Sequence, residues 1–141
     1  MIESGTTITW EAWGQKYKPN QDWNHAWGAS TANLLPRFVL GAQPLTPGGK
    51  RAVIRTNPGN LKFAKGKTPT PLGPLLVSWT NDTNFKLSLT LPNGVNARIE
   101  LPATENSSGV FNRDKPVRAH REGSRWLLHK HDSGNVTFEV R

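Results

Sequence analysis

Glu11 is the residue with the clearest chemical potential, because it stands between Trp10 and Trp13 in the run Thr-Trp-Glu-Ala-Trp. Aromatic neighbours can exclude water from a carboxylate, and the lost solvation raises its pKa toward the range in which a general base works. By spacing alone, the same run also fits an ordinary surface glutamate. Glu11 is therefore a candidate catalytic residue, and the residues around it have to decide between the two interpretations.

His25 is the second candidate, and it lies between Trp23 and Trp27. A lone histidine among aromatic residues is more often a hydrogen-bonded structural group than a functional one. A sugar site, however, combines these same features, because flat rings cover C–H faces and charged groups bind hydroxyls. The candidate site therefore joins two polar residues to three tryptophans: Glu11, His25, Trp10, Trp13 and Trp27.

We expect no metal ion and no cofactor. The chain has no cysteine, which excludes disulfides, a thiolate nucleophile and cysteine-ligated metals. His129 and His131 are two residues apart beside Asp132 and could point to one side of a strand, but no third ligand stands in a fixed register. The sequence also contains no phosphate-binding glycine loop and no serine nucleophile elbow.

A helix must position His25. Apolar residues follow a helical stripe in this part of the chain, and Asp22 is a plausible N-cap. Pro36 should then break or kink the helix, or start a second short helix that Gly41 ends. Residues 6–10 alternate and are β-branched, which predicts an extended segment before Glu11. The stripe consists of Trp23, Trp27, Leu34 and Phe38.

The rest of the chain has the period-two pattern of β-strands. Apolar and polar residues alternate over 85–91 and 95–101, on either side of a Pro-Asn-Gly turn, which predicts a hairpin with one buried face. Short strands separated by turn residues predict a mainly β protein, an antiparallel β-sandwich. The polar stretch 103–117 is expected to be a long mobile loop. The other expected strands are 51–56, 61–64, 75–80, 124–130 and 136–140.

Length and charge limit the remaining function classes. The 141 residues suffice for one core, no apolar run reaches membrane-spanning length, and residues 1–10 lack signal-peptide features. The sequence does not determine the cellular compartment; for a parent protein the candidates are the periplasm and secretion from the cell. The net charge of +8 comes from residues 47–141, with 15 basic against 7 acidic residues spread singly, which fits an acidic polymer partner. Without a recognition helix or a basic run, we expect no nucleic-acid partner and no membrane partner.

The order of these motifs resembles the C-terminal end of bacterial α-L-rhamnosidases of glycoside hydrolase family 78. The resemblance is strongest in the runs around Glu11 and His25 and in the Pro-Leu-Thr-Pro-Gly segment that follows them. Further short segments of the sequence resemble the family's C-terminal β-sandwich. The segments that carry the resemblance are 6–13, 22–29, 44–48, 54–59, 64–66 and 73–79.

The resemblance implies a division of the chain and roles for the candidate residues. Residues 1–46 would be the last active-site loop and helix of an (α/α)6 catalytic barrel, and 47–141 the β-sandwich that caps it. Glu11 matches the family's general base, which activates water for attack with inversion. His25 matches the histidine that contacts rhamnose, and Trp10, Trp13 and Trp27 would form walls of that site.

The general acid of such an enzyme is missing from this sequence. Inverting hydrolysis needs two carboxylates about 6.5–9.5 Å apart, and the resemblance puts the acid upstream in the barrel. We therefore expect a fragment of an enzyme that acts on terminal α-L-rhamnosyl groups of plant-type glycans, inactive alone. A standalone carbohydrate-binding module is the alternative, and it makes no catalytic demand on Glu11. Aromatic surface cut from a barrel also predicts self-association, or disorder in residues 1–30.

Overall fold

The computed structural model describes residues 3, 5, 9–22 and 25–141. The chain divides into two compact units, Met1–Leu35 and Pro36–Arg141. This division precedes the expected boundary between Thr46 and Pro47, because strand β1, Ala42–Pro44, pairs with strand β2, Arg51–Arg55. The assignment of the first part to a catalytic barrel stays a prediction.

Three helical segments follow one another around Pro36. A 3-10 turn, Ala26–Ala29, leads into helix α1, Ser30–Leu34, and then into a π-helical turn, Leu35–Val39. The N-cap position belongs to His25, which has extended backbone angles, so the expected Asp22 cap is wrong. Proline has no N–H and clashes with the carbonyl four residues earlier, which explains the wider turn at Pro36. The extended segment expected over 6–10 and the stripe residue Trp23 lie largely outside the described residues.

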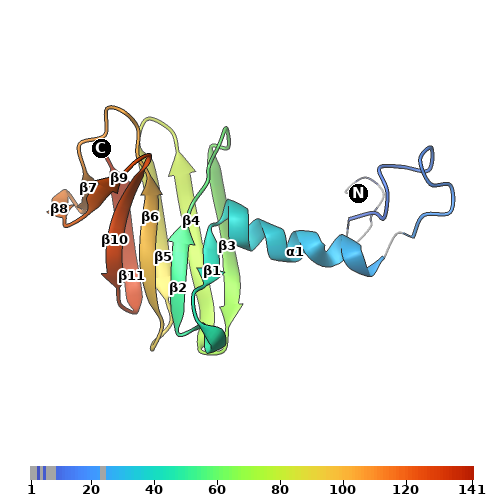
Figure 1. Ribbon diagram of the computed structural model, residues 1–141, viewed down its shortest axis with the longest axis horizontal. Helices are drawn as coiled ribbons and strands as arrows, with labels where there is room; N and C mark the ends of the chain where they lie inside the picture. Colours follow the sequence, from blue (N-terminus) through green and yellow to red (C-terminus); the bar gives the residue numbers. More distant parts are fainter. Residues whose placement is uncertain (1–2, 4, 6–8, 23–24) are drawn as a thin grey trace. The chain divides into compact units, whose positions relative to one another are not determined.

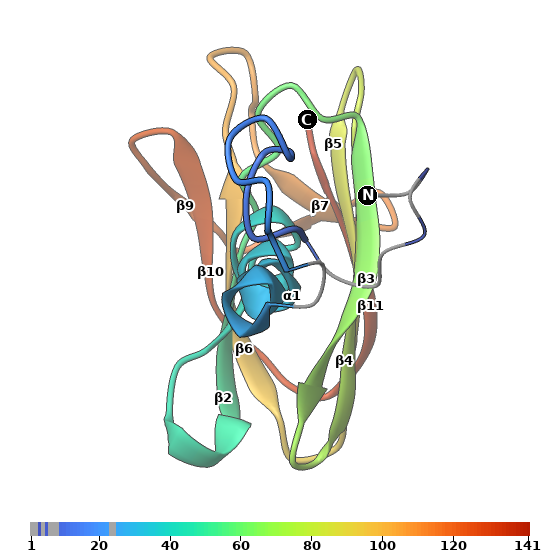
Figure 2. The ribbon, with the colours of Figure 1, turned by 90° about the vertical axis from the view of Figure 1, so that its right-hand side faces the viewer.

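The second unit is a sandwich of two sheets (Figure 1). Figure 2 shows the sheets as two layers, with β2, β6 and β10 in one and β3, β4 and β5 in the other. One sheet has the order β1-β2-β6-β10-β9, where β6 is Asn96–Pro102, β10 is Arg125–His131 and β9 is His120–Glu122. The other has the order β3-β4-β5-β11-β7-β8: Phe63–Thr70, Gly73–Asn81, Phe85–Leu91, Gly134–Val140, Val110–Asn112 and Lys115–Val117.

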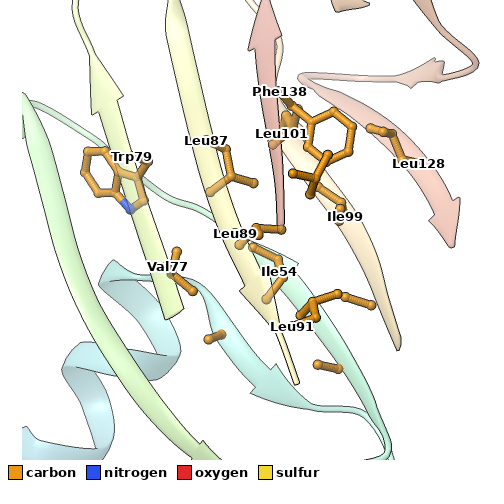
Figure 3. Close-up of a cluster of buried hydrophobic side chains, with 14 of the residues drawn as sticks. Ile54, Val77, Trp79, Leu87, Leu89, Leu91, Ile99, Leu101, Leu128 and Phe138 are labelled. Atoms are coloured by element: carbon orange, nitrogen blue, oxygen red, sulfur yellow. The ribbon is translucent and has the colours of Figure 1, made fainter. Parts of the chain in front are cut away.

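The core lies between the two sheets and consists of alternate strand residues (Figure 3). Trp79 is its largest fully buried side chain, and its indole N–H donates a hydrogen bond of 3.1 Å to the Val39 carbonyl. Gly41 follows with a φ of +82°, and a Cβ there would collide with the Arg55 backbone. Position 41 therefore requires glycine, which ends the helical turn and leads into β1.

The expected hairpin of 85–91 and 95–101 is wrong, although the turn between them is present. Val95 donates a backbone hydrogen bond to the Pro92 carbonyl, and the two strands then enter opposite sheets. Strand β5 pairs with β4 and β11, whereas β6 pairs with β2 in parallel and with β10. Both strands bury one face, and facing each other across a sandwich satisfies the same alternation as pairing side by side.

Two further expectations about strands need correction. Strand β3 runs to Thr70, well past the predicted end at Ala64, because an edge strand tolerates Pro69. The expected loop 103–117 contains β7 and β8, which pair as a hairpin. Their turn residues Arg113 and Asp114 both have positive φ, the backbone of a tight hairpin turn. Turns of this type usually carry Asn or Gly, so the sequence gives little sign of it.

The Glu139 carboxylate, near the end of strand β11, links the stability of the sandwich to pH. Hydrogen bonds from Arg141 and Asn84 lower the pKa of Glu139 from 4.5 to about 2. A carboxylate with a lowered pKa in the folded state stabilises the fold above its unfolded pKa and loses that contribution as pH falls. The urea concentration at the midpoint of unfolding should therefore decrease as the pH is lowered from 4.5 toward about 2. The decrease should be less steep in Glu139→Gln. Circular dichroism across that pH range measures this. The exposed control Glu105→Gln should keep the wild-type slope, and identical curves for both variants would contradict the assignment.

Candidate functional site

The first unit brings two stretches of chain together around Glu11. The Glu11 backbone N–H donates to the Asp22 carbonyl at 3.3 Å, and the Asp22 N–H donates to the Glu11 carboxylate at 3.1 Å. The Thr9 hydroxyl donates to the Gly28 carbonyl. A Cβ at Gly28 would collide with the Thr9 carbonyl, so this close approach requires a glycine. The backbone around Glu11 is thereby tied to the segment that carries His25.

The Glu11 carboxylate is the centre of the site, and its side chain is only 6% exposed. One of its oxygens forms an ion pair with the Lys18 ammonium and lies 3.7 Å from Nε2 of His25. At 3.7 Å the imidazole makes an electrostatic contact and not a hydrogen bond. The structure thus brings Glu11 and His25 together, as the sequence predicted. The contact between Lys18 and Glu11 was not predicted, because the sequence distinguishes Lys18 only as one of two lysines near Glu11.

The expected rise in the pKa of Glu11 is wrong. The hydrogen bond from Lys18, together with that from the Asp22 backbone, lowers the pKa of this carboxyl below 4.5, and outweighs the opposing effect of burial. Trp13, one of the residues expected to exclude water, is 95% exposed. Glu11 is therefore ionised at neutral pH, which is the protonation state that a general base requires.

The tryptophans differ in their relation to the carboxylate. The Trp27 ring lies against the His25 ring at a tilt of 33°, with centroids 4.3 Å apart, and most of the Trp27 surface stays exposed. Trp10 is half-buried next to Glu11. An exposed indole beside an ion-paired carboxylate and an imidazole can offer a flat apolar face and hydrogen-bonding groups to one sugar ring. Trp27 joins the pair Glu11 and His25, whereas Trp13 stands free of it on the surface.

The other histidine candidates point to different places. His129 stacks on His120 of β9 at 4.8 Å, whereas His131 lies edge-on to Phe138 at 5.8 Å. An irregularity in β10 between Leu128 and His131 separates the two directions. Among the described residues, no three His, Asp or Glu side chains are grouped as metal ligands, and no helix is long and apolar enough to cross a bilayer.

Comparison with known protein families decides what the second unit is. Residues 41–115 match the family described as bacterial alpha-L-rhamnosidase C-terminal domain, and this range is more than half of the 141 residues. The chain belongs to this family. The match includes strands β1 to β7, so most of the sandwich is a rhamnosidase C-terminal domain.

Individual relatives agree with this family. An α-L-rhamnosidase from Alteromonas sp. (strain LOR) is 31% identical over 127 residues, which cover 83% of this chain and 14% of that protein. The α-L-rhamnosidase structure from Dictyoglumus thermophilum has a TM-score of 0.82 at 23% identity, and covers 100% of this chain and 17% of its own. The structure of the Streptomyces avermitilis α-L-rhamnosidase complexed with L-rhamnose has a TM-score of 0.78 at 24% identity. That match covers 99% of this chain and 14% of the Streptomyces chain. The two structures show the same fold, and this rhamnosidase domain corresponds to a small part of each relative.

Proposed function

We propose that this chain is the C-terminal part of an inverting α-L-rhamnosidase and that it contributes the general base, Glu11. The observation that carries the proposal is the 3.7 Å approach of Glu11 to His25, with the Trp27 ring against the imidazole. This group stands shortly before the rhamnosidase C-terminal domain in the sequence. A carboxylate, an imidazole and an indole in one place suit a sugar ring better than they suit any other ligand class considered above.

In this proposal Glu11 acts on water. A water proton passes to the Glu11 carboxylate while the water oxygen bonds to the anomeric carbon of rhamnose. The bond to the leaving oxygen breaks at the same time, and a second carboxyl group protonates that oxygen. The attack comes from the face opposite the leaving group, so the configuration inverts. The lowered pKa of Glu11 keeps the carboxylate ionised, while the Lys18 ammonium that lowers it also makes the carboxylate a weaker base as long as the two are paired.

His25 and the tryptophans would position the sugar. The contact with Glu11 orients the imidazole, which can then hydrogen-bond a rhamnose hydroxyl. Trp27 would cover an apolar C–H face of the ring, and Trp10 and Trp13 would complete the walls. The substrates in this proposal are terminal α-L-rhamnosyl groups of plant-type glycans.

The second carboxyl group, the general acid, would come from the part of the parent enzyme upstream of this chain. The isolated chain should therefore not hydrolyse an aryl α-L-rhamnoside above background. A hybrid enzyme tests this, in which the chain replaces the stretch of the Alteromonas α-L-rhamnosidase that it matches. General acid catalysis contributes about 10²–10⁴-fold, so the hybrid should exceed the isolated chain by at least that factor. Full activity of the isolated chain, or a folded hybrid without activity, would contradict the proposal.

The exposed apolar side chains of the helical segment predict self-association. Trp27 and Leu34 of the first unit and Phe38 of the second are each about half exposed or more, and apolar side chains left in water favour association between chains. Analytical ultracentrifugation should show a dimer whose fraction falls in Leu34→Ser/Phe38→Ser. The matched control is Phe63→Ser, which removes an exposed aromatic ring of the sandwich. A strict monomer at every concentration would refute this expectation.

A further inference from the structure

The outer face of the six-stranded sheet is hollowed into a groove of about 810 Å³. This volume falls in the range of small-molecule sites, about 300–1,000 Å³. The groove lies over β3, β4, β5 and β11 and reaches the turn between β7 and β8. It belongs entirely to the second unit and shares no residue with the Glu11 site.

Strand pairing arranges the side chains of the groove in two rows. The first row runs Lys65, Ser78, Ser88, Thr137, and each member is directly opposite the next on the neighbouring strand. Directly opposite residues share a face, so these side chains all point outward. The Ser88 and Thr137 hydroxyls lie 3.1 Å apart. With strands about 4.8 Å apart, the row is about 14 Å long.

The second row runs parallel to the first and adds a cation, an apolar surface and an amide. It consists of Lys67, Leu76, Thr90 and Asn135. The Leu76 side chain is exposed, although its strand neighbours Leu75 and Val77 are buried in the core. An exposed leucine among hydroxyl and amide groups can contact the C–H face of a sugar ring. The two rows together line the groove with polar groups and one apolar patch.

The groove is positively charged at both ends. Lys65 and Lys67 stand on β3 at one side, and Arg113 stands on the β7–β8 turn at the other. No acidic side chain lines the groove, and none of these cations forms an ion pair with any described residue. Two arginines of the other sheet differ, because Arg55 and Arg98 are both paired with Glu100. The charge of the groove is therefore left for a ligand.

We infer that this groove binds an acidic oligosaccharide, with its uronate carboxylates at Lys65, Lys67 and Arg113 and its hydroxyls on the serine, threonine and asparagine side chains between them. Cations on two sides of a neutral hydroxyl-binding surface fit a chain with spaced single charges better than one compact anion. Nucleic acid fits less well, because single-stranded binding relies on aromatic stacking and no aromatic residue lines the groove. The inference does not depend on the proposed role of Glu11.

Isothermal titration of the full chain with oligogalacturonate tests the inference. Removing two cations, in Lys65→Gln/Lys67→Gln, should weaken binding about tenfold, because each exposed charge pair contributes a factor of up to about five to the affinity. The control Lys50→Gln/Lys130→Gln removes the same charge from exposed positions outside the groove and should change the affinity less than about twofold. Glu11→Gln should leave binding unchanged, which separates this site from the proposed catalytic one.

Three results would overturn the inference. Equal losses in the two double variants would mean that net charge alone attracts the polymer. Tighter binding of a single-stranded oligonucleotide that is lost in Lys65→Gln/Lys67→Gln would assign the groove to nucleic acid. Absence of oligogalacturonate binding would leave the two lysines the role of protecting the exposed edge of β3 from pairing with other chains.

Discussion

Replacing Glu11 by glutamine in the hybrid rhamnosidase is expected to lower kcat about 10²–10⁴-fold and to change KM little. The amide keeps the size of the side chain and its contact with the Asp22 N–H, but it cannot accept the proton of the attacking water. Steady-state hydrolysis of an aryl α-L-rhamnoside measures the effect. Glu105→Gln, which changes an exposed glutamate of the sandwich, should keep the parent rate.

A nucleophile that needs no base distinguishes catalysis from a structural role. In Glu11→Ala, added azide can take the place of the water, bond to the anomeric carbon and displace the leaving oxygen. Because no proton has to be removed from azide, the rate should rise with its concentration and the product should be a rhamnosyl azide of inverted configuration. A folded Glu11→Ala hybrid whose rate does not respond to azide, with no azide product, would indicate that Glu11 supports the structure only.

The second large effect concerns the stability of the sandwich. Trp79→Ala is expected to reduce the free energy of unfolding by about 3–5 kcal/mol, because it leaves a cavity in a close-packed core. The side chain is 1% exposed and lies between the two sheets, 6.0 Å from the Phe85 ring. Whole domains are stable by only about 5–15 kcal/mol, so this loss brings the sandwich near unfolding. Urea unfolding followed by circular dichroism gives the value.

Two tryptophan variants serve as controls for this prediction. Trp79→Phe keeps an aromatic ring but loses the hydrogen bond to the Val39 carbonyl, and it should cost about 1–3 kcal/mol. Trp13→Ala removes an indole that is almost entirely exposed and should change stability by less than about 0.5 kcal/mol. If Trp79→Ala unfolded at the same urea concentration as Trp13→Ala, the packing described for the core would be incorrect.

The alternation of apolar residues predicted the strands well but not their partners. Each of Leu87, Leu89, Ile99 and Leu101 is buried, as the period-two pattern indicated. That pattern reports which face of a strand meets the core, and it is the same for a hydrogen-bonded neighbour and for a strand in the opposite sheet. The partners of β5 and β6 depend on the path of the chain after Gly94, which local sequence does not encode. The short strands β7 and β8 lacked any alternation long enough to detect.

The sequence pointed to Glu11 and His25 as neighbours, but not to Lys18 or to the electrostatics of the site. The motif spacing indicated that Glu11 and His25 act together, and the structure brings them within 3.7 Å. The expected aromatic enclosure was the wrong basis for the pKa, because Lys18 reaches the carboxylate through a turn that begins at Gly14. Outside a regular helix or strand, the sequence does not determine where the side chain of a residue seven positions away points. The contact between Lys18 and Glu11 therefore becomes visible only in the structure.

A crystal structure of the hybrid enzyme with L-rhamnose bound would test the central claim most directly. We expect the sugar to lie against Trp27, with a His25 nitrogen on one of its hydroxyls and the Glu11 carboxylate within about 2.6–3.2 Å of a water or hydroxyl at the anomeric carbon. Rhamnose bound elsewhere, with Glu11 and His25 turned to opposite sides of the molecule, would contradict it.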